Sequence, residues 1–308
     1  MASDSKTAGA GRPRRYVLAG AALDAPPLAS GLYLVATPIG NLTDISLRAL
    51  QTLAAADVIA CEDSRVTRKL TEHYGIATPL TPYHEHNAAE ARPKLLARLA
   101  TGQAVALVSD AGTPLISDPG YKLVRAASEA GRVVIAVPGA SAVLTALTVA
   151  GLPTDRFFFE GFLPPKQAAR QKRIAALASI PATLVLFESG PRLPVALADL
   201  AAGLGPRPAA ICRELTKLHE EIRRDDLASL AQHYEHGGET RGEIVIVVAP
   251  PQEESESAGD VDELLRRALA RVSVKDAVGE VALATGRPRR EVYQRALALA
   301  KEGGDGAA

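Results

Sequence analysis

Carboxylate, hydroxyl and glycine residues are concentrated in one loop that follows a short apolar run. The stretch VALVSDAGTPLISDPGYKLV, residues 105–124, begins as a buried strand and continues through Asp110, Thr113 and Ser117 before helical periodicity resumes. Connections between a strand and a helix usually need about two to six residues. This connection is longer, its glycines let the backbone approach a ligand, and its polar side chains can hold one. We therefore interpret it as a ligand-binding loop.

Three further loops of similar composition follow predicted strands: ATPIGN, CEDSR and PGASAV, at residues 36–41, 61–65 and 138–143. In open α/β sheets, ligands bind outside the carboxyl ends of the strands, because loops and helix N-termini converge there. We expect the four loops to hold one small polar ligand. Asp110 can accept hydrogen bonds from an ammonium group or a ribose, and Thr113 and Ser117 can donate them. For any single loop, helix capping or a turn is the structural alternative.

Other ligand classes lack their sequence signals. No GxGxxG follows the first predicted strand, and GxxxxGK[ST] does not occur, so neither a dinucleotide fingerprint nor a phosphate-binding P-loop is predicted. The two cysteines, Cys61 and Cys212, lie far apart and have no CxxC partner. In an extended segment His84 and His86 point in opposite directions, which suits a shared metal poorly. We predict no metal site and expect His84 to contact a substrate.

Charged residues in the second half of the chain are candidates for phosphate binding and acid–base chemistry. FESGPRL and CRELTKLHEE present the candidates Glu188, Glu214, Arg192, Arg213 and Lys217. PPKQAARQKRIAAL adds Lys166, Arg170, Lys172 and Arg173 with little opposing charge nearby in the sequence. Long basic side chains beside a cleft are natural phosphate ligands, although a solvated helix face explains the second group equally well.

The elements that must position these residues alternate between strand and helix. Apolar segments near residues 31–35, 57–61, 105–108 and 133–137 are separated by segments of helical periodicity. Continuous Val, Leu, Ile and Ala strands with helices between them predict a mainly parallel sheet covered on both faces. A second α/β unit follows, with strands expected within residues 182–189, 208–215 and 242–250 and a helix within 192–205.

Composition shifts suggest the domain boundaries. We expect a disordered tail over residues 1–30, α/β domains over 31–150 and 151–250, and an acidic linker over 251–260. A module of three short helices is expected over 261–302, followed by a tail over 303–308. The chain of 308 residues is 47% apolar, and its 35 basic residues balance its 35 acidic ones, so no net field steers the whole molecule onto nucleic acid. No apolar run reaches the roughly 18 to 20 residues of a membrane span.

Several of these stretches together resemble the tetrapyrrole methylase superfamily. They are LYLVATPIGNLTDISLRAL, ACEDSRVTRKL, HEHN, ALVSDAGTPLISDPGYKLV, PGASAVLTALTVAGLPTDRFFFEGFLPPK and RELTK. The resemblance is closest to the branch that methylates the ribose 2′-oxygen of a cytidine in the decoding region of 16S rRNA. It implies two α/β domains with a cleft for S-adenosylmethionine between them, plus a small C-terminal helical module that contacts RNA or the ribosome.

The resemblance also assigns roles to individual residues. Backbone near 186–188 is expected to contact the cofactor, together with Pro38, Gly40, Asp110, Thr113, Leu115, Ile116, Ser117, Ser141 and Ala142. Substrate contacts are expected from Asp63, Arg65, His84, Arg192 and Arg213. A base that takes the proton of the 2′-hydroxyl would assist methyl transfer, and Glu188, Glu214 and Lys217 are the candidates.

Members of this branch usually carry ESTHRL where this chain has ESGPRL, so Gly190 and Pro191 replace a hydroxyl and an imidazole. The implied partner is 16S rRNA within the 30S subunit, the implied assembly a homodimer, and the implied location the cytoplasm, with no membrane contact. Two alternatives stay open. One is a methylase acting on a tetrapyrrole or a protein side chain. The other is a ribosome-binding factor without catalysis, which an intact SDAGTP loop disfavours.

Overall fold

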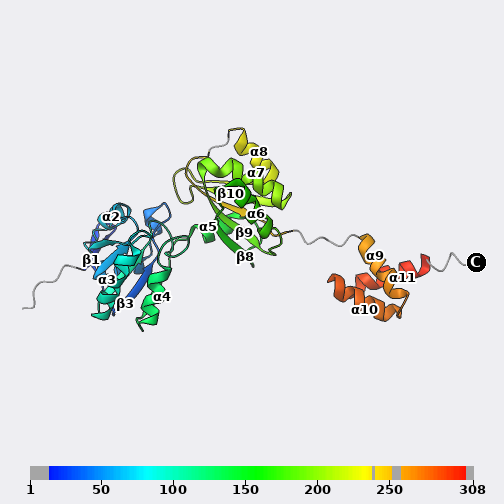
Figure 1. The fold of residues 1–308 in the computed structure, drawn as a ribbon, viewed down its shortest axis with the longest axis horizontal. Helices are drawn as coiled ribbons and strands as arrows, with labels where there is room; N and C mark the ends of the chain where they lie inside the picture. Colours follow the sequence, from blue (N-terminus) through cyan, green and yellow to red (C-terminus); the bar gives the residue numbers. More distant parts are fainter. Residues whose placement is uncertain (1–13, 238–239, 252–257, 303–308) are drawn as a thin grey trace, which may run out of the picture. The chain divides into compact units, whose positions relative to one another are not determined.

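Five short apolar strands form the first sheet (Figure 1). The computed structural model describes residues 14–237, 240–251 and 258–302. In it the strand order is β5-β4-β6-β3-β7, and every pairing is parallel. The strands are β3 Gly31–Val35, β4 Val58–Cys61, β5 Leu80–Pro82, β6 Ala104–Val108 and β7 Val134–Val137. Because both faces of a parallel sheet are buried, these strands are continuous apolar runs, which confirms the predicted parallel α/β arrangement.

Helices cover both faces of this sheet. Leu50 and Leu53 of one helix pack against Ile59 on one face, and Leu95 and Leu123 pack against the other. Asp63 and Ser141 cap two of the helices, because their side-chain oxygens accept hydrogen bonds from backbone N–H groups of the first turn. The elements are η1 Leu42–Asp44, α1 Leu47–Ala55, α2 Ser64–His73, α3 Ala88–Ala100, α4 Tyr121–Glu129 and α5 Ala142–Ala150.

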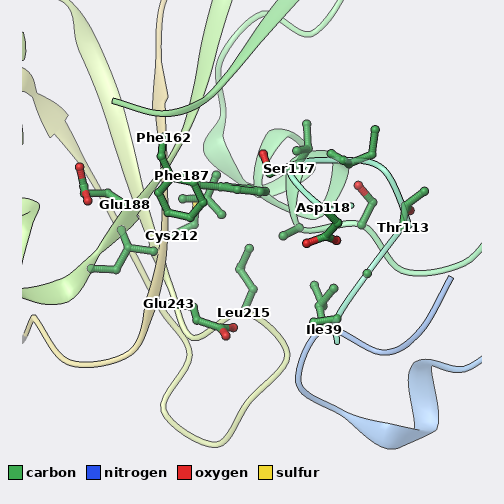
Figure 2. Close-up of a pocket in the computed structure, with 18 of the residues that line it drawn as sticks. Ile39, Thr113, Ser117, Asp118, Phe162, Phe187, Glu188, Cys212, Leu215 and Glu243 are labelled. Carbon is green, nitrogen blue, oxygen red and sulfur yellow. The ribbon is translucent and has the colours of Figure 1, made fainter. Parts of the chain in front are cut away.

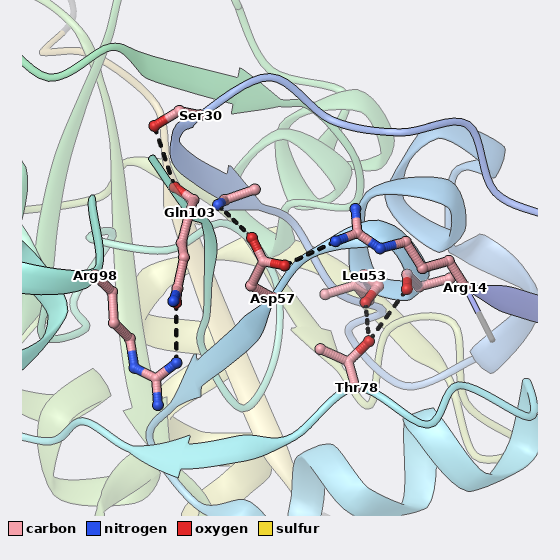
Figure 3. Close-up of polar contacts among 9 residues, drawn as sticks. Arg14, Ser30, Leu53, Asp57, Thr78, Arg98 and Gln103 are labelled. Carbon is pink, nitrogen blue, oxygen red and sulfur yellow. Dashed lines mark hydrogen bonds and ion pairs between the residues drawn. The ribbon is translucent and has the colours of Figure 1, made fainter. Parts of the chain in front are cut away.

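The segment before the first sheet is ordered, contrary to the sequence-based expectation. Strands β1 Arg15–Leu18 and β2 Ala21–Asp24 form an antiparallel hairpin. Tyr16 is buried in the core, and an ion pair of 2.8 Å joins Arg14 to Asp57, which also accepts a hydrogen bond from the Ala104 N–H (Figure 3). The prediction of disorder over residues 1–30 was therefore wrong for 14–30, because these contacts anchor the hairpin. Residues 1–13 lie outside the described part.

The second sheet has the order β11-β10-β12-β9-β8, and only β8 and β9 pair in parallel. Its strands are β8 Phe157–Phe162, β9 Thr183–Ser189, β10 Pro208–Arg213, β11 Glu221–Asp226 and β12 Glu243–Val248. Strand β11 has the sequence EIRRDD, so apolar patterning could not reveal it. It adds to the sheet by backbone pairing with β10 along all six residues.

Alternation along the second sheet separates its two faces. Leu184 and Leu186 of β9 belong to the core formed with α6 Gln167–Leu177, α7 Leu193–Leu204 and α8 Leu227–Glu235. Val185 and Phe187 face the other way and pack with residues of α5 and with Ile39. A short η2 helix, Gly190–Arg192, follows β9. The face that carries Phe187 therefore belongs to a core that draws residues from both halves of residues 1–251.

Contacts divide the chain into two compact units, residues 1–251 and 252–308. The second unit contains α9 Ala258–Leu269, α10 Val274–Thr285 and α11 Arg289–Glu302, whose buried residues include Leu265, Val281 and Ala296. The three predicted helices are present, but α9 begins inside the predicted linker, at 258. Residues 252–257 and 303–308 lie outside the described part. Among the described helices, none is both long and apolar enough to cross a membrane.

Candidate functional site

The loop after β6 forms one wall of a cavity of about 330 Å³ (Figure 2). Five residues named as cofactor contacts line this first cavity: Thr113, Ile116 and Ser117 from the loop, and Ser141 and Ala142 at the start of α5. Phe187 of β9 and Leu215, which follows β10, supply the opposite wall. The loop quoted at the outset thus faces the second sheet across this cavity.

Backbone contacts hold this loop against its neighbours. Thr37 and Gly112 exchange two backbone hydrogen bonds, of 2.9 and 3.1 Å, and the Thr113 hydroxyl donates to the Ala140 carbonyl at 3.2 Å. Leu115 and Ser117 have positive φ values of 75° and 63°. A non-glycine residue in this region costs about 1–3 kcal/mol and persists only where its surroundings enforce it. The loop is therefore a strained, fixed wall.

Leu115 is the one predicted cofactor contact that lines neither cavity described for this unit. Its side chain packs instead with the apolar core around Leu107 and Leu123. The positive φ at Leu115 turns that side chain inward while its neighbour Ile116 faces the first cavity. Sequence reasoning could not separate the two, because both are apolar and adjacent.

A second cavity of about 470 Å³ adjoins the first, since Ile39, Ala111 and Glu243 line both. The remaining predicted cofactor contacts, Pro38, Gly40 and Asp110, lie in its wall. Helix α2 supplies another part of that wall through four residues, and Leu42 and Lys217 add to it. The α2 residues are Val66, Thr67, Lys69 and Leu70.

Carboxylates gather where the two cavities meet the ends of β4 and β6. Burial raises the pKa of Asp118, the Ser109 hydroxyl lowers it, and the charge of Asp110 raises it further, for a net rise. Burial also raises the pKa of Asp110, although this carboxylate accepts a hydrogen bond of 2.9 Å from the Asp63 N–H. A carboxylate that is costly to ionise is stabilised by any cation placed beside it. The wall is thus suited to a positively charged ligand.

Aromatic side chains form the apolar end of the first cavity. The Phe187 ring lies 4.9 Å from the Phe159 ring and 5.6 Å from the Phe162 ring, both edge-on. Cys212 lies in the same wall, where burial raises the pKa of its thiol to about 12. A thiol of that pKa stays protonated at neutral pH and is no nucleophile. The cavity therefore offers an apolar surface against which a flat ring can pack.

Lys217 bridges the two halves of the site. Its ammonium group donates to Glu214 Oε1 at 2.8 Å and to Glu243 Oε2 at 3.0 Å, and a Cβ on Gly40 would lie only 2.4 Å from Lys217 Cγ. Burial lowers the pKa of Lys217, but these two hydrogen bonds and the charges of both glutamates together raise it by more, so the net shift is upward. Lys217 therefore stays protonated and has no free lone pair to act as a base.

The other two base candidates are also poorly placed. Burial raises the pKa of Glu214, but hydrogen bonds from Lys217 and the Glu243 N–H lower it more, so Glu214 stays ionised and is a weak proton acceptor. Glu188 contributes to the wall of the first cavity, yet its side chain points away from that cavity in Figure 2. Strand alternation explains this direction, because Phe187 occupies the cavity face. The Glu188 carboxylate instead pairs with Arg192 at 3.2 Å.

The predicted substrate contacts line neither cavity. Asp63 and Arg65 pair with each other at 2.6 Å, and that hydrogen-bonded contact lowers the pKa of Asp63 to about 2. Arg213 pairs with Glu221 at 3.1 Å. His84 lies in the loop after β5, and its Nδ1 is buried without a hydrogen-bond partner among the described residues. Across all the residues that the structure describes, no group of three or more His, Cys, Asp or Glu side chains is placed to hold a metal ion.

Several lining residues were missed, and the sequence contains a signal for two of them. Asp118 lies in the quoted loop, where the sequence is equally consistent with a ligand contact and with a cap of the next helix. Glu243 opens a strand whose other five residues are apolar, so its charge is easily overlooked. Its backbone oxygen accepts from the Glu214 N–H at 2.9 Å, and its position in both walls follows from the order of strands, which the sequence does not state.

A close backbone approach accompanies the glycine at the local departure from ESTHRL. A Cβ at this position would lie 1.4 Å from the Thr240 carbonyl oxygen. No side chain fits without moving the backbone at 240, two residues before Gly242 in the wall of the first cavity. Gly190 is therefore required by a close backbone approach, and Arg192 keeps a hydrogen bond of 2.6 Å to the Leu163 carbonyl.

Comparisons with known proteins agree with this geometry. Residues 31–231 match the family described as Tetrapyrrole (Corrin/Porphyrin) Methylases, and residues 255–300 match the RsmI C-terminal HTH domain. A protein of Mesorhizobium japonicum named Ribosomal RNA small subunit methyltransferase I is 52% identical over 285 residues, covering 92% of this chain and 97% of the relative. A protein of the same name from Pseudomonas aeruginosa is 45% identical, covering 87% and 97%.

A solved structure of diphthine synthase aligns with a TM-score of 0.56 at 20% identity, covering 71% of this chain and 89% of the other. At that identity the likeness shows the fold alone. It confirms the predicted two-part α/β architecture.

Proposed function

The chain belongs to the tetrapyrrole methylases, and from this we propose that it is an S-adenosylmethionine-dependent methyltransferase acting on the RNA of the small ribosomal subunit. The observation that carries the substrate class is the 52% identity to a relative of that name along nearly the whole of both chains. We assign residues 31–150 and 151–250 to the two α/β domains around the cofactor, and residues 261–302 to a helical module that contacts RNA.

The first cavity fits the cofactor. S-adenosylmethionine carries a flat adenine ring, a cationic sulfonium and an amino-acid group, and when bound it supplies an activated methyl group. Phe187 and Ile116 offer an apolar surface for the ring, and the raised pKa of Asp118 marks a carboxylate that a cation would stabilise. Thr113, Ser117 and Ser141 add hydroxyl groups for the polar parts. A volume of about 330 Å³ is within the usual range for small-molecule sites.

The chain's own residues supply alignment and proton acceptance. Methyl transfer is an in-line displacement, so the fixed loop of residues 110–118 and the Lys217 bridge serve mainly to hold two reactants in register. A 2′-hydroxyl is a weak nucleophile that gains from a base accepting its proton. Asp110 lies in the wall of the second cavity and has a raised pKa, so it suits this task better than Glu188, Glu214 or Lys217.

Further details follow from the resemblance. The methylated atom is the ribose 2′-oxygen of a cytidine in the decoding region of 16S rRNA, the substrate is the 30S subunit, and the enzyme acts as a cytoplasmic homodimer. Arg65, Arg192 and Arg213 hold flanking phosphates only if substrate binding releases their present carboxylate partners. Asp63 and His84 lie beside the RNA that these arginines hold.

A substrate panel tests this proposal. The protein is incubated with methyl-labelled S-adenosylmethionine and, separately, with 30S subunits, protein-free 16S rRNA, 50S subunits and a tetrapyrrole mixture. We expect label in the 30S subunit, with less or none in the 50S control. Label in the tetrapyrrole alone would replace the RNA assignment with a tetrapyrrole methylase. Binding of the cofactor without label in any acceptor would indicate a protein that has lost catalysis.

A further inference from the structure

We propose that the second cavity is the pocket for the nucleotide to be methylated, and that Lys69 binds a phosphate of that RNA. This inference rests on the proposed function and adds to it the place where the substrate nucleotide binds. The pocket lies between helix α2, the loop after β3 and the Asp110 loop. None of the residues predicted from the sequence as substrate contacts lines it, and the inference reassigns Pro38, Gly40 and Asp110, predicted as cofactor contacts, to the nucleotide pocket.

The first argument is position. The two cavities share Ile39, Ala111 and Glu243, so a molecule in one borders a molecule in the other. Methyl transfer requires the attacking oxygen and the methyl carbon to approach to about 3–3.5 Å before reaction. Two adjoining cavities, the first suited to the cofactor, meet this requirement. At about 470 Å³ the second has the size of an ordinary small-molecule site.

The second argument is the chemistry of the wall. Two cations line it, but Lys217 already pairs with Glu214 and Glu243. Among the described residues no ion pair involves Lys69, and its side chain is exposed on α2. Apolar contacts from Leu42, Val66 and Leu70 flank it. An available ammonium group beside an apolar surface suits a phosphate next to a nucleobase.

The test compares Lys69→Ala with Arg68→Ala. Arg68 is the adjacent exposed cation on α2 and does not line the cavity, so it controls for general loss of positive charge. Binding of each variant to 30S subunits is measured as a function of salt, together with binding of S-adenosylhomocysteine and the kinetics of methyl transfer. Loss of one phosphate contact should reduce the slope of log affinity against log salt by about 0.7 to 1.

We expect Lys69→Ala to lower kcat/KM for 30S subunits about tenfold and to reduce the salt slope, with cofactor affinity unchanged within about twofold. Arg68→Ala should keep the wild-type slope. If the wild-type protein is active and the two variants have the same kinetics and the same salt slope, the pocket assignment is wrong. The proposed function is not affected by that result. If the wild-type protein labels no RNA, the proposed function fails, and the pocket assignment fails with it. A second variant, Val66→Trp, should block the pocket and reduce turnover while leaving cofactor binding intact.

Discussion

Lys217 shows how one side chain can hold a site together without taking part in the reaction. Its ammonium group joins Glu214 to Glu243, and its methylene groups pack against Gly40 from the other half of the site. Because Gly40 has no Cβ, the lysine stem can lie directly against the backbone of the loop after β3. The sequence RELTK indicated that this lysine matters, but it could not distinguish a base from a structural cation.

Substitution of Lys217 separates these roles. Arginine keeps the positive charge and cannot act as a base at neutral pH, whereas methionine keeps the stem and removes the charge. We expect Lys217→Arg to retain methyl transfer within about tenfold, and Lys217→Met to lose more, since it leaves two carboxylates unpaired. Steady-state kinetics on 30S subunits measures both. Complete loss of turnover in Lys217→Arg, with the fold and cofactor binding intact, would support the base role.

Asp118 illustrates a conflict between stability and ligand binding. Burial and the charge of Asp110 raise its pKa above that in the unfolded chain, despite the Ser109 hydroxyl. The folded state therefore binds this proton more tightly. The resulting stability is present below the ordinary aspartate pKa and is lost as pH rises through the higher folded pKa. At neutral pH the ionised carboxylate opposes folding.

Asp118→Asn should therefore raise Tm at pH 7, with a difference that shrinks toward pH 4. The same change should weaken binding of cationic S-adenosylmethionine more than binding of uncharged S-adenosylhomocysteine. Thermal unfolding at both pH values and titration calorimetry provide the measurements. Asp155→Asn, at an exposed position, serves as the control. An unchanged or lower Tm at pH 7 would show that the buried charge is compensated in the folded state.

At the scale of elements, helix α6 shows where sequence reasoning about charge fails. Arg170 and Arg173 were predicted as phosphate ligands or solvated residues, because few acids lie near them in the sequence. In the fold, Arg170 is buried against Asp199 of α7 at 2.6 Å, and Arg173 pairs with Glu160 of β8. The opposing charges come from distant segments, which local sequence cannot reveal. Burial of Arg170 in this ion pair contradicts its interpretation as a phosphate ligand or a solvated residue, whereas Arg173 stays partly exposed to solvent.

The α6–α7 ion pair has a strong expected effect on stability. Removing one partner of a buried pair leaves an uncompensated charge and usually costs about 3 to 5 kcal/mol. We expect Arg170→Ala to lower the free energy of unfolding by that amount in urea titrations. Lys172→Ala, on the exposed face of the same helix, should change it by less than about 0.5 kcal/mol. A similar small change for both would mean that the pair contributes little net stability.

At the scale of the whole molecule, the first sheet was predictable because buried parallel strands leave continuous apolar runs. The β1–β2 hairpin and β11 were not, since a hairpin anchored by Tyr16 and a strand of charged residues carry no such signal. The same limit applies to the site. Loop composition located Thr113, Ser117 and Ser141, whereas Glu243 and the second cavity depend on which strands and helices are neighbours.

The identity of the methylated nucleoside tests the account most directly. The protein is incubated with 30S subunits and methyl-labelled S-adenosylmethionine, and the 16S rRNA is then digested to nucleosides and separated against standards. The account predicts that the label elutes with 2′-O-methylcytidine. Label in a base-methylated nucleoside, or none in the RNA of a preparation that binds the cofactor, would contradict it.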